Sequence, residues 1–322
     1  MEQFEIAIIG AGISGLMAAT HFAENGRSSV LFDKGRGPGG RMNTRRFGEF
    51  RLDHGAQFFT VRDSRFEKYV QRWEKAGVAK IWCKGFSLAG DGHPRFRGTD
   101  GMNSIPKWLA GQLDVRTGHK VKSVQLAHQS WQLDFFEDFP SVCADQLLMT
   151  SPVPQSIALL ETGKVELASS TKNYLNKISY DPCIAMMVLP KQPLLMPKHG
   201  AWQINQEPLQ FIADNKLKGL TNPGQALTIH LGPQASTKYW ESEPEQLIDL
   251  VRGELRKRGT ELEIWQMEVH RWRYSQPVEI HEESLLVAKG LPNLVFAGDA
   301  FAGPKIEGAA LSGLSAAQAM LA

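Results

Sequence analysis

The chain is poor in cysteine, with three residues at positions 83, 143 and 183 that are widely spaced and form no C-x-x-C pair. An odd, dispersed set predicts neither a disulfide framework nor a zinc site, and it favours reduced thiols in a cytoplasmic protein. The nine histidines also lack metal-binding spacing, because neither H-x-x-x-H nor H-E-x-x-H occurs. We therefore predict no metal site.

Net charge is also small. The 36 basic and 34 acidic side chains leave +2, which gives no reason to expect a nucleic-acid or membrane partner. Residues 6–19 carry no charge and could be taken for a membrane span or a signal sequence. Their acidic N-terminal flank and the glycines and serines within the run argue against both. We expect a soluble protein of ordinary globular composition, with a monomer favoured.

The most informative segment is a glycine motif between two strand-like runs. Residues 4–9 lead into Gly10-Ala11-Gly12-Ile13-Ser14-Gly15, a helix-like stretch follows, and a second strand ends at Asp33. The first glycine allows the tight turn, the second lets backbone N–H groups approach a pyrophosphate, and the third lets the helix pack on the strand. Asp33 lies 18 residues past Gly15, where a carboxylate can accept from a ribose hydroxyl. We predict dinucleotide binding by Gly10, Ala11, Gly12, Ser14, Gly15 and Asp33.

Two further segments suit phosphate and polyol groups. Gly39-Gly40-Arg41 lies in a glycine- and arginine-rich loop directly after Asp33 and Lys34. Such a loop can be a merely solvated one, but its place after an acid-terminated strand favours phosphate contact. Near the C-terminus, a strand over 293–297 leads to Asp299, and a helix is expected from about Gly308. Asp299 could also be an ordinary helix cap.

The pattern of elements predicts an α/β protein with a discontinuous domain. Helices are expected over 64–76 with a Ser cap, 102–113 and 244–258, a hairpin over 79–97, and strands over 115–126, 130–136 and 146–149. Elements of the dinucleotide type occupy both ends of the chain, and a strand-rich insertion lies between them. We predict a Rossmann-like FAD-binding domain from 1–75, 98–160 and 286–322, and a mixed-sheet substrate domain from 76–97 and 161–285.

Together these motifs resemble the FAD-binding signatures of the flavin amine oxidase superfamily, which has a glutathione-reductase-type FAD domain. The resemblance implies non-covalent FAD, since no Cys follows Cys183 to form the covalent link found in some members. By the same resemblance, the acid binds the adenosine side, Arg41 approaches the pyrophosphate, and Asp299 approaches the ribityl or phosphate. The implied FAD contacts are Lys34, Gly40, Arg41, Gln57, Phe58, Val121, Asp299, Gly308 and Ala309.

The segments at 53–60, 213–216, 228–230 and 271–276 resemble the renalase family, specifically its bacterial members. That resemblance implies oxidation of the 2- and 6-dihydro isomers of NAD(P)H to NAD(P)⁺, by hydride transfer to flavin N5, with O₂ reduced to H₂O₂. No catalytic acid or base is then required, because the product is an aromatic cation. The protein must hold the ring on the flavin.

The substrate contacts we expect are Gln57, Asn215, His230, Trp202 and Trp272. Several of these have an ordinary structural alternative: the tryptophans could be core, His230 could be a hydrogen-bonded structural histidine, and Asn215 could form a turn. Two other functions remain open. One is a different FAD-dependent amine oxidase or desaturase, which aromatic side chains perpendicular to the flavin would favour. The other is a non-catalytic nucleotide-binding module, which a colourless purified protein would favour.

Overall fold

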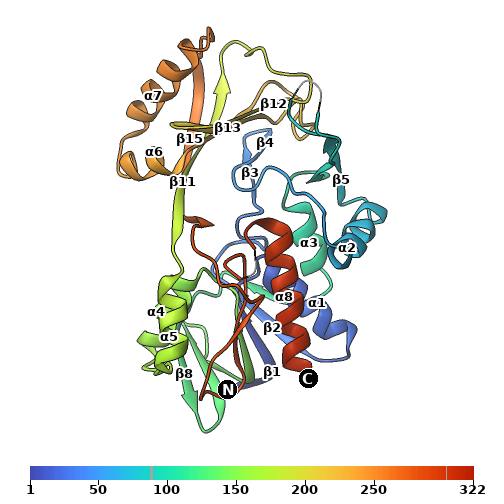
Figure 1. The fold of residues 1–322 in the computed structure, drawn as a ribbon, viewed down its shortest axis with the longest axis vertical. Coiled ribbons are helices and arrows are strands. Elements are labelled where there is room, and N and C mark those ends of the chain that lie inside the picture. The colour runs from blue at the N-terminus through green and yellow to red at the C-terminus, as the bar shows by residue number, and fades with distance from the viewer. Residues whose placement is uncertain (88–89, 302) are drawn as a thin grey trace.

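The computed structural model describes residues 1–87, 90–301 and 303–322. Two sheets lie one above the other along the long axis of the molecule (Figure 1). The lower sheet begins at the N-terminus of the chain and is flanked by helices on both sides, one of which, at the C-terminus, ends the chain. The upper sheet comes from the middle of the chain. This arrangement confirms the predicted α/β class with a Rossmann-like domain and a mixed-sheet part.

The lower sheet is mainly parallel, with strand order β16-β17-β10-β1-β2-β7 and the β8–β9 hairpin attached to β10. Strand β1 lies between β10 and β2 and is parallel to both, as in a dinucleotide-binding fold. The strands are β1 (Glu2–Ile9), β2 (Ser29–Asp33), β7 (Asp114–Thr117), β8 (Val121–Ala127), β9 (Ser130–Phe135), β10 (Val142–Met149), β16 (Leu286–Val287) and β17 (Leu294–Phe296).

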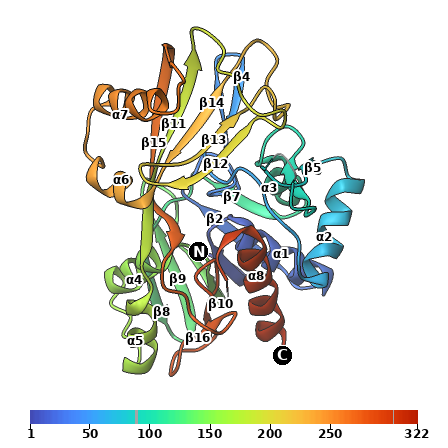
Figure 2. The same cartoon turned by 45° about the horizontal axis from the view of Figure 1, so that its top comes forward.

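Apolar side chains of β1 point alternately to the two faces of this sheet and are buried on both, as expected for a strand covered on each side. Ile6 and Ile8 face helices α1, α2, α3 and α8, whereas Ala7 and Ile9 face the β8–β9 hairpin and helices α4 and α5. Figure 2 shows the two groups of helices on opposite sides. The helices are α1 (Ile13–Glu24), α2 (Ser64–Lys75), α3 (Ser104–Ala110), α4 (Val153–Thr162), α5 (Ser169–Lys177) and α8 (Lys305–Leu321).

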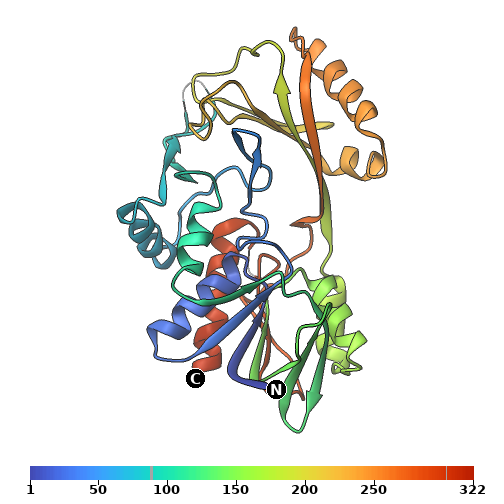
Figure 3. The same cartoon turned by 180° about the vertical axis from the view of Figure 1, so that it is seen from behind.

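The upper sheet has five antiparallel strands in the order β12-β13-β14-β11-β15. One face packs on helices α6 (Pro233–Lys238) and α7 (Pro244–Arg256), and the other faces the dinucleotide part. The long strands β11 and β15 run down toward the lower sheet, as the view from behind also shows (Figure 3). The strands are β11 (Tyr180–Pro190), β12 (Ala201–Gln206), β13 (Leu209–Asp214), β14 (Leu227–Leu231) and β15 (Ile264–Pro277).

Two hairpins lie between the sheets. Strands β3 (Thr44–Phe47) and β4 (Phe50–Asp53) form one, and β5 (Ala79–Cys83) and β6 (Arg95–Gly98) form the other. The second confirms the expected pairing over 79–97, although residues 88 and 89 of its connection lie outside the described residues. Among the described residues, no helix is long and apolar enough to cross a membrane.

Several element predictions need correction. The strand expected over 115–126 is interrupted at Gly118, which has a φ of +74° and separates β7 from β8. Helix α2 is capped by Asp63, whose carboxylate accepts from the Arg65 N–H, and not by Ser64. Helix α8 begins at Lys305, three residues before the expected start. Helices α5 and α6 were not expected, because both are short and mostly polar.

The predicted domain boundaries remain a prediction. Helix α5, placed on the substrate side of the boundary near residue 160, contributes Leu175 to the core under the lower sheet. Trp82 and Phe86, from the predicted 76–97 piece, pack against Phe211 of the upper sheet.

Candidate functional site

The glycine turn after β1 has the geometry that the three glycines require. Gly10 has a φ of +109°, a conformation that L side chains rarely adopt. A Cβ on Gly15 would lie 2.1 Å from the carbonyl oxygen of Gly10, so helix α1 can pack on the turn only with glycine there. A Cβ on Gly12 would meet nothing within 4 Å. The first and third glycines therefore serve the fold, and the second faces open space.

The N-terminus of α1 fits an anion. This end of the helix has no side-chain cap, and no acidic residue lies in its first turn. Ser14 is 4% exposed, and its Oγ has no hydrogen-bond partner. An uncapped helix start presents unpaired N–H groups and a partial positive charge, which suits a phosphate. The buried Ser14 hydroxyl adds a donor in need of a partner.

Asp33 holds the loops around this turn. One carboxylate oxygen accepts from the Ala11 N–H at 2.8 Å and the other from the Gly35 N–H at 2.7 Å. Burial raises the pKa of Asp33, and these two hydrogen bonds oppose the shift. Each oxygen keeps a further lone pair for a ribose hydroxyl. Nearby, Lys34 donates to Gln155 at 3.0 Å, and Val121 begins β8 with a buried side chain.

The second glycine loop lies directly against the first. Gly39 and Gly40 have φ values of +118° and +53°, and the Gly39 N–H donates to the carbonyl of Ala11 at 2.8 Å. Arg41 follows, but its guanidinium pairs with the carboxylate of Asp299 through two hydrogen bonds of 2.6 and 2.7 Å. Two groups predicted to contact FAD separately thus bind each other across the site.

Burial alone would lower the pKa of Arg41, but the charge of Asp299 and its hydrogen bonds raise it. The same guanidinium donates to the carbonyls of Tyr274 and Ser275 in β15. It therefore ties the lower sheet to the long strand of the upper one. Such bidentate pairs are among the stronger charge-assisted contacts.

The start of α8 closes this side of the site. A Cβ on Gly308 would lie 2.1 Å from the carbonyl oxygen of Gly303, so the turn before the helix packs directly on it. Ala309, the next predicted cofactor residue, is 7% exposed. Further along, a Cβ on Gly313 would lie 2.0 Å from the carbonyl oxygen of Ser14. The middle of α8 thus packs directly on the first turn of α1.

A buried ion pair lies between this region and the upper sheet. The Lys218 ammonium is 2.7 Å from the Asp53 carboxylate, and both side chains are fully buried. Asp53 also accepts from the Thr44 hydroxyl at 2.5 Å and from the Met102 N–H at 2.8 Å. Burial lowers the pKa of Lys218, which the charge of Asp53 opposes. The pair fixes the 53–57 segment to the loop after β13.

Gln57 and Asn215, both predicted substrate contacts, belong to this network. Gln57 accepts from Lys218 at 3.1 Å and donates to the carbonyls of Asp53 and Gly55. Asn215 accepts from the Asp53 N–H and donates to the Thr228 hydroxyl at 3.0 Å. Each amide is therefore held in one orientation by several partners.

His230 and Trp272 meet at the neighbouring His54. The Trp272 indole N–H donates to the His54 carbonyl at 2.9 Å, and the His230 Nε2 lies 3.3 Å from the same oxygen. The His54 ring stacks on Trp272 at 5.3 Å and meets His270 edge-on at 4.9 Å. Its Nδ1 is buried without a hydrogen-bond partner. We call His54, His230, His270 and Trp272 the histidine cluster.

The histidine cluster is uncharged at neutral pH. Burial, followed by the neighbouring charges of His270 and Arg45, lowers the pKa of His54 to about 3. Burial also lowers the pKa of His230 to about 4, opposed by the hydrogen bond to His54 and assisted by Lys218. Burial and the charge of Arg45 likewise lower the pKa of His270. The cluster offers neutral donors and acceptors rather than charge.

Phe58 is part of an aromatic group with Trp82, Phe86 and Phe211, with ring centroids 4.9 to 6.5 Å apart. The Lys218 ammonium lies 4.8 Å from the centroid of the Trp82 ring. This group covers the far side of the buried ion pair, so Phe58 packs against the upper sheet and its predicted cofactor contact stays a prediction.

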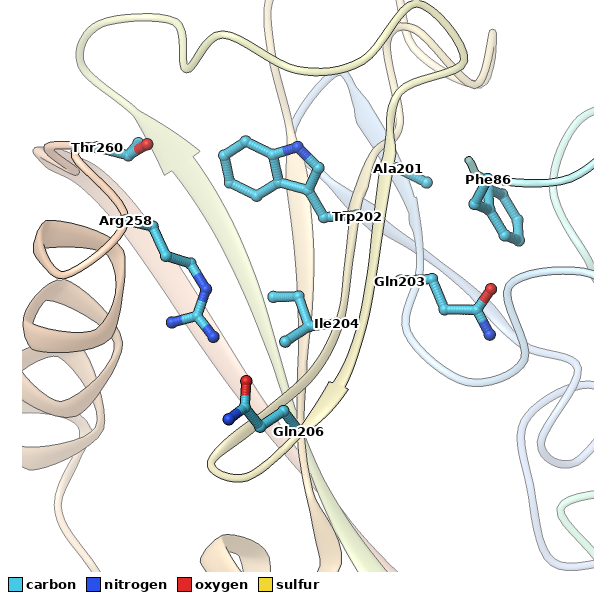
Figure 4. A pocket seen from close by; sticks show the side chains of 8 residues that line it. All are labelled: Phe86, Ala201, Trp202, Gln203, Ile204, Gln206, Arg258 and Thr260. Carbon is cyan, nitrogen blue, oxygen red and sulfur yellow. The ribbon is translucent and has the colours of Figure 1, made fainter. Parts of the chain in front are cut away.

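The structure does not bring Trp202 to the histidine cluster. Trp202 packs with the apolar residues on the helix-covered face of the upper sheet, whereas Thr228 and His230 lie on the opposite face. The period of two in a strand separates them. Trp202 lines a pocket of about 420 Å³ at the edge of the sheet, shown in Figure 4. That pocket involves none of the residues predicted to bind the cofactor.

Four residues of the buried ion pair and the histidine cluster escaped the sequence analysis: Lys218, Asp53, His54 and His270. A lysine in a short polar loop after Asp214 looks exposed, and no local pattern reveals that its side chain is buried. Asp53 and His54 lie within the motif that suggested Gln57, but Lys218 and His230, which they contact, lie more than 150 residues away in the sequence.

Comparison with known proteins identifies the family. Residues 8–73 match the NAD(P)-binding Rossmann-like domain, and residues 73–321 match the flavin-containing amine oxidoreductase model. The chain belongs to the flavin-containing amine oxidoreductase family. Its cofactor is FAD, as predicted. The residues of the site fit FAD. Gly12 leaves space for it, and the start of α1 with Ser14 offers donors that have no partner. Asp33 and Arg41, together with the α8 region, supply charge.

The individual relatives are more distant. The 4,4'-diapophytoene desaturase of Staphylococcus aureus is 34% identical over 77 residues, which cover 21% of this chain and 15% of the relative. The chain spans about one sixth of the length of the curated relatives it matches. Among solved structures, a fatty acid isomerase from P. acnes has a TM-score of 0.72 at 13% identity, covering 98% of each chain. A putrescine oxidase mutant has 0.71 at 12%, covering 99% of each. These likenesses show the fold.

Proposed function

We propose that this FAD-dependent oxidoreductase oxidises the 2- and 6-dihydro isomers of NAD(P)H to NAD(P)⁺, as the resemblance to the renalase family implies. FAD, when bound, accepts a hydride and passes the electrons to O₂, which gives H₂O₂. The protein's own residues have to bind an uncharged dihydropyridine ring, orient its carboxamide and keep water away from it.

The observation that carries the proposal is the charge of the cluster. Asp53 is paired with Lys218, and Glu268 is paired with Arg45. The histidine cluster beside them is neutral. A site of this kind suits an uncharged ring.

The orientation of the ring is the second requirement. Trp272 and His54 form a stacked aromatic pair, and the buried His54 Nδ1 has no partner in the protein. A carboxamide has both a donor and an acceptor, so it could satisfy such a nitrogen in either tautomer. Gln57 and Asn215, each fixed by several hydrogen bonds, would hold the backbone around this position.

Anaerobic mixing of the purified yellow protein with each dihydro-NAD(P) isomer tests the proposal. We expect rapid bleaching of the flavin absorbance by the 2- or 6-dihydro isomer, and much slower bleaching by ordinary 4-dihydro NADH. If neither isomer bleached the flavin, the proposal would be refuted.

An amine oxidase or a desaturase is the second candidate, because relatives of both kinds match this chain or share its fold. Bleaching by putrescine or another simple amine would favour the amine oxidase.

A further inference from the structure

Arg45 pairs with strand β15 and acts on the histidine cluster. Its Nε lies 2.8 Å from the Glu268 carboxylate, and its charge acts on both His54 and His270. The side chain remains 43% exposed. It therefore lies at the solvent-facing rim of the cluster, with part of the guanidinium accessible.

Strand β15 places these groups in a line. Glu268, His270 and Trp272 are every second residue of the strand, so they lie on the same face of it. That face is turned toward the lower part of the molecule. At about 3.3 Å per residue, the Cα of Glu268 lies about 13 Å from that of Trp272 along the strand. The line runs from the aromatic pair of His54 and Trp272, through a neutral histidine, to an exposed guanidinium. It suits a ligand with an uncharged ring at one end and an anion at the other.

We propose that Arg45 binds the diphosphate of a dinucleotide substrate whose ring occupies the histidine cluster. The inference rests on the proposed function and makes it more specific: the enzyme selects dinucleotides over nucleosides that have no phosphate. Glu268 is then an internal competitor that pairs with Arg45 until a phosphate replaces it. Guanidinium and phosphate match in charge and in hydrogen-bond geometry.

Arg46, which follows Arg45 in strand β3, supplies a matched control. Arg46 is also an exposed arginine of β3, but alternation directs it to the opposite face of the hairpin, where its register partner is Arg51. Substitution of Arg46 changes the net charge as much as substitution of Arg45 does. A difference between the two variants therefore reports position and not overall charge.

Titration calorimetry of the FAD-loaded protein tests the inference without turnover. We expect Arg45→Gln to weaken NAD⁺ binding about tenfold, the loss of one charge-assisted contact, and to leave nicotinamide riboside binding unchanged. Glu268→Gln should tighten NAD⁺ binding about two- to fivefold. Arg46→Gln should match the wild type. The affinity difference for Arg45→Gln should shrink at high salt.

Kinetics separate this inference from the proposed function. With the dihydro isomers, Arg45→Gln should raise KM and leave kcat near the wild-type value. Equal NAD⁺ affinities in the Arg45 and Arg46 variants, or no NAD⁺ binding at all, would overturn the inference even if the isomers bleach the flavin. Failure of bleaching in the wild type would instead refute the proposed function.

Discussion

The buried pair of Lys218 and Asp53 allows a sharp test of the structure. Both side chains are fully buried, and their nearest polar atoms lie 2.7 Å apart. Asp53→Asn removes the compensating charge but leaves the ammonium with Gln57 at 3.1 Å and the Trp82 ring at 4.8 Å. Those neutral partners do not replace a carboxylate. We expect a loss of about 3–5 kcal/mol in the free energy of unfolding, as for other buried ion pairs broken on one side.

Lys218→Met should cost less, because the Asp53 carboxylate keeps its hydrogen bonds from the Thr44 hydroxyl and the Met102 N–H. The double variant should lose less than the sum of the two single losses, because neither charge is then left alone. Urea unfolding of the FAD-loaded protein, followed by far-UV circular dichroism, gives the four free energies of this cycle.

The exposed pair of Lys191 and Glu263, 3.9 Å apart, provides the control. Glu263→Gln should change the unfolding free energy by less than about 1 kcal/mol. If Asp53→Asn changed stability as little as this control, or if the two substitutions were additive, the ion pair would not be buried as described.

Three further predictions concern Gly12, Asp33 and the two buried histidines. Gly12→Ala should leave stability within about 0.5 kcal/mol, because its Cβ meets no protein atom, yet weaken FAD retention; unchanged flavin content after dialysis would place the pyrophosphate elsewhere. Asp33→Ala should weaken FAD binding by about 1.5–3 kcal/mol, and undiminished flavin after dialysis would reject that role. The pKa values of His54 and His230, about 3 and about 4, lie below the unfolded value of 6.5. The contribution of these neutral histidines to the free energy of unfolding is therefore fully present above pH 6.5 and is lost as the pH falls toward 4. The slope is about 1.4 kcal/mol per pH unit for each histidine. His230→Asn should flatten that slope in pH-dependent urea unfolding, whereas the exposed His93→Gln should not.

The cofactor half of the site is determined by short sequence motifs. The three glycines and Asp33 lie within 24 residues, and each role depends on its immediate neighbours, so the β1–α1–β2 geometry could be predicted from the sequence. The same holds for the Gly39-Gly40-Arg41 loop, whose glycines do adopt positive φ values. The pairing of Arg41 with Asp299 could not be predicted, because 258 residues separate them.

The substrate half depends on long-range contacts. The sequence by itself determined that Gln57, Asn215, His230 and Trp272 deserved attention, and the structure gathers them around one short segment. Only the tertiary structure decided that Trp202 lies on the other face of its sheet, that Lys218 is buried, and that Arg45 stands at the rim of the histidine cluster. The physical reason is that burial and charge pairing arise where the two sheets meet, whereas a sequence pattern reports only what each strand or turn does locally.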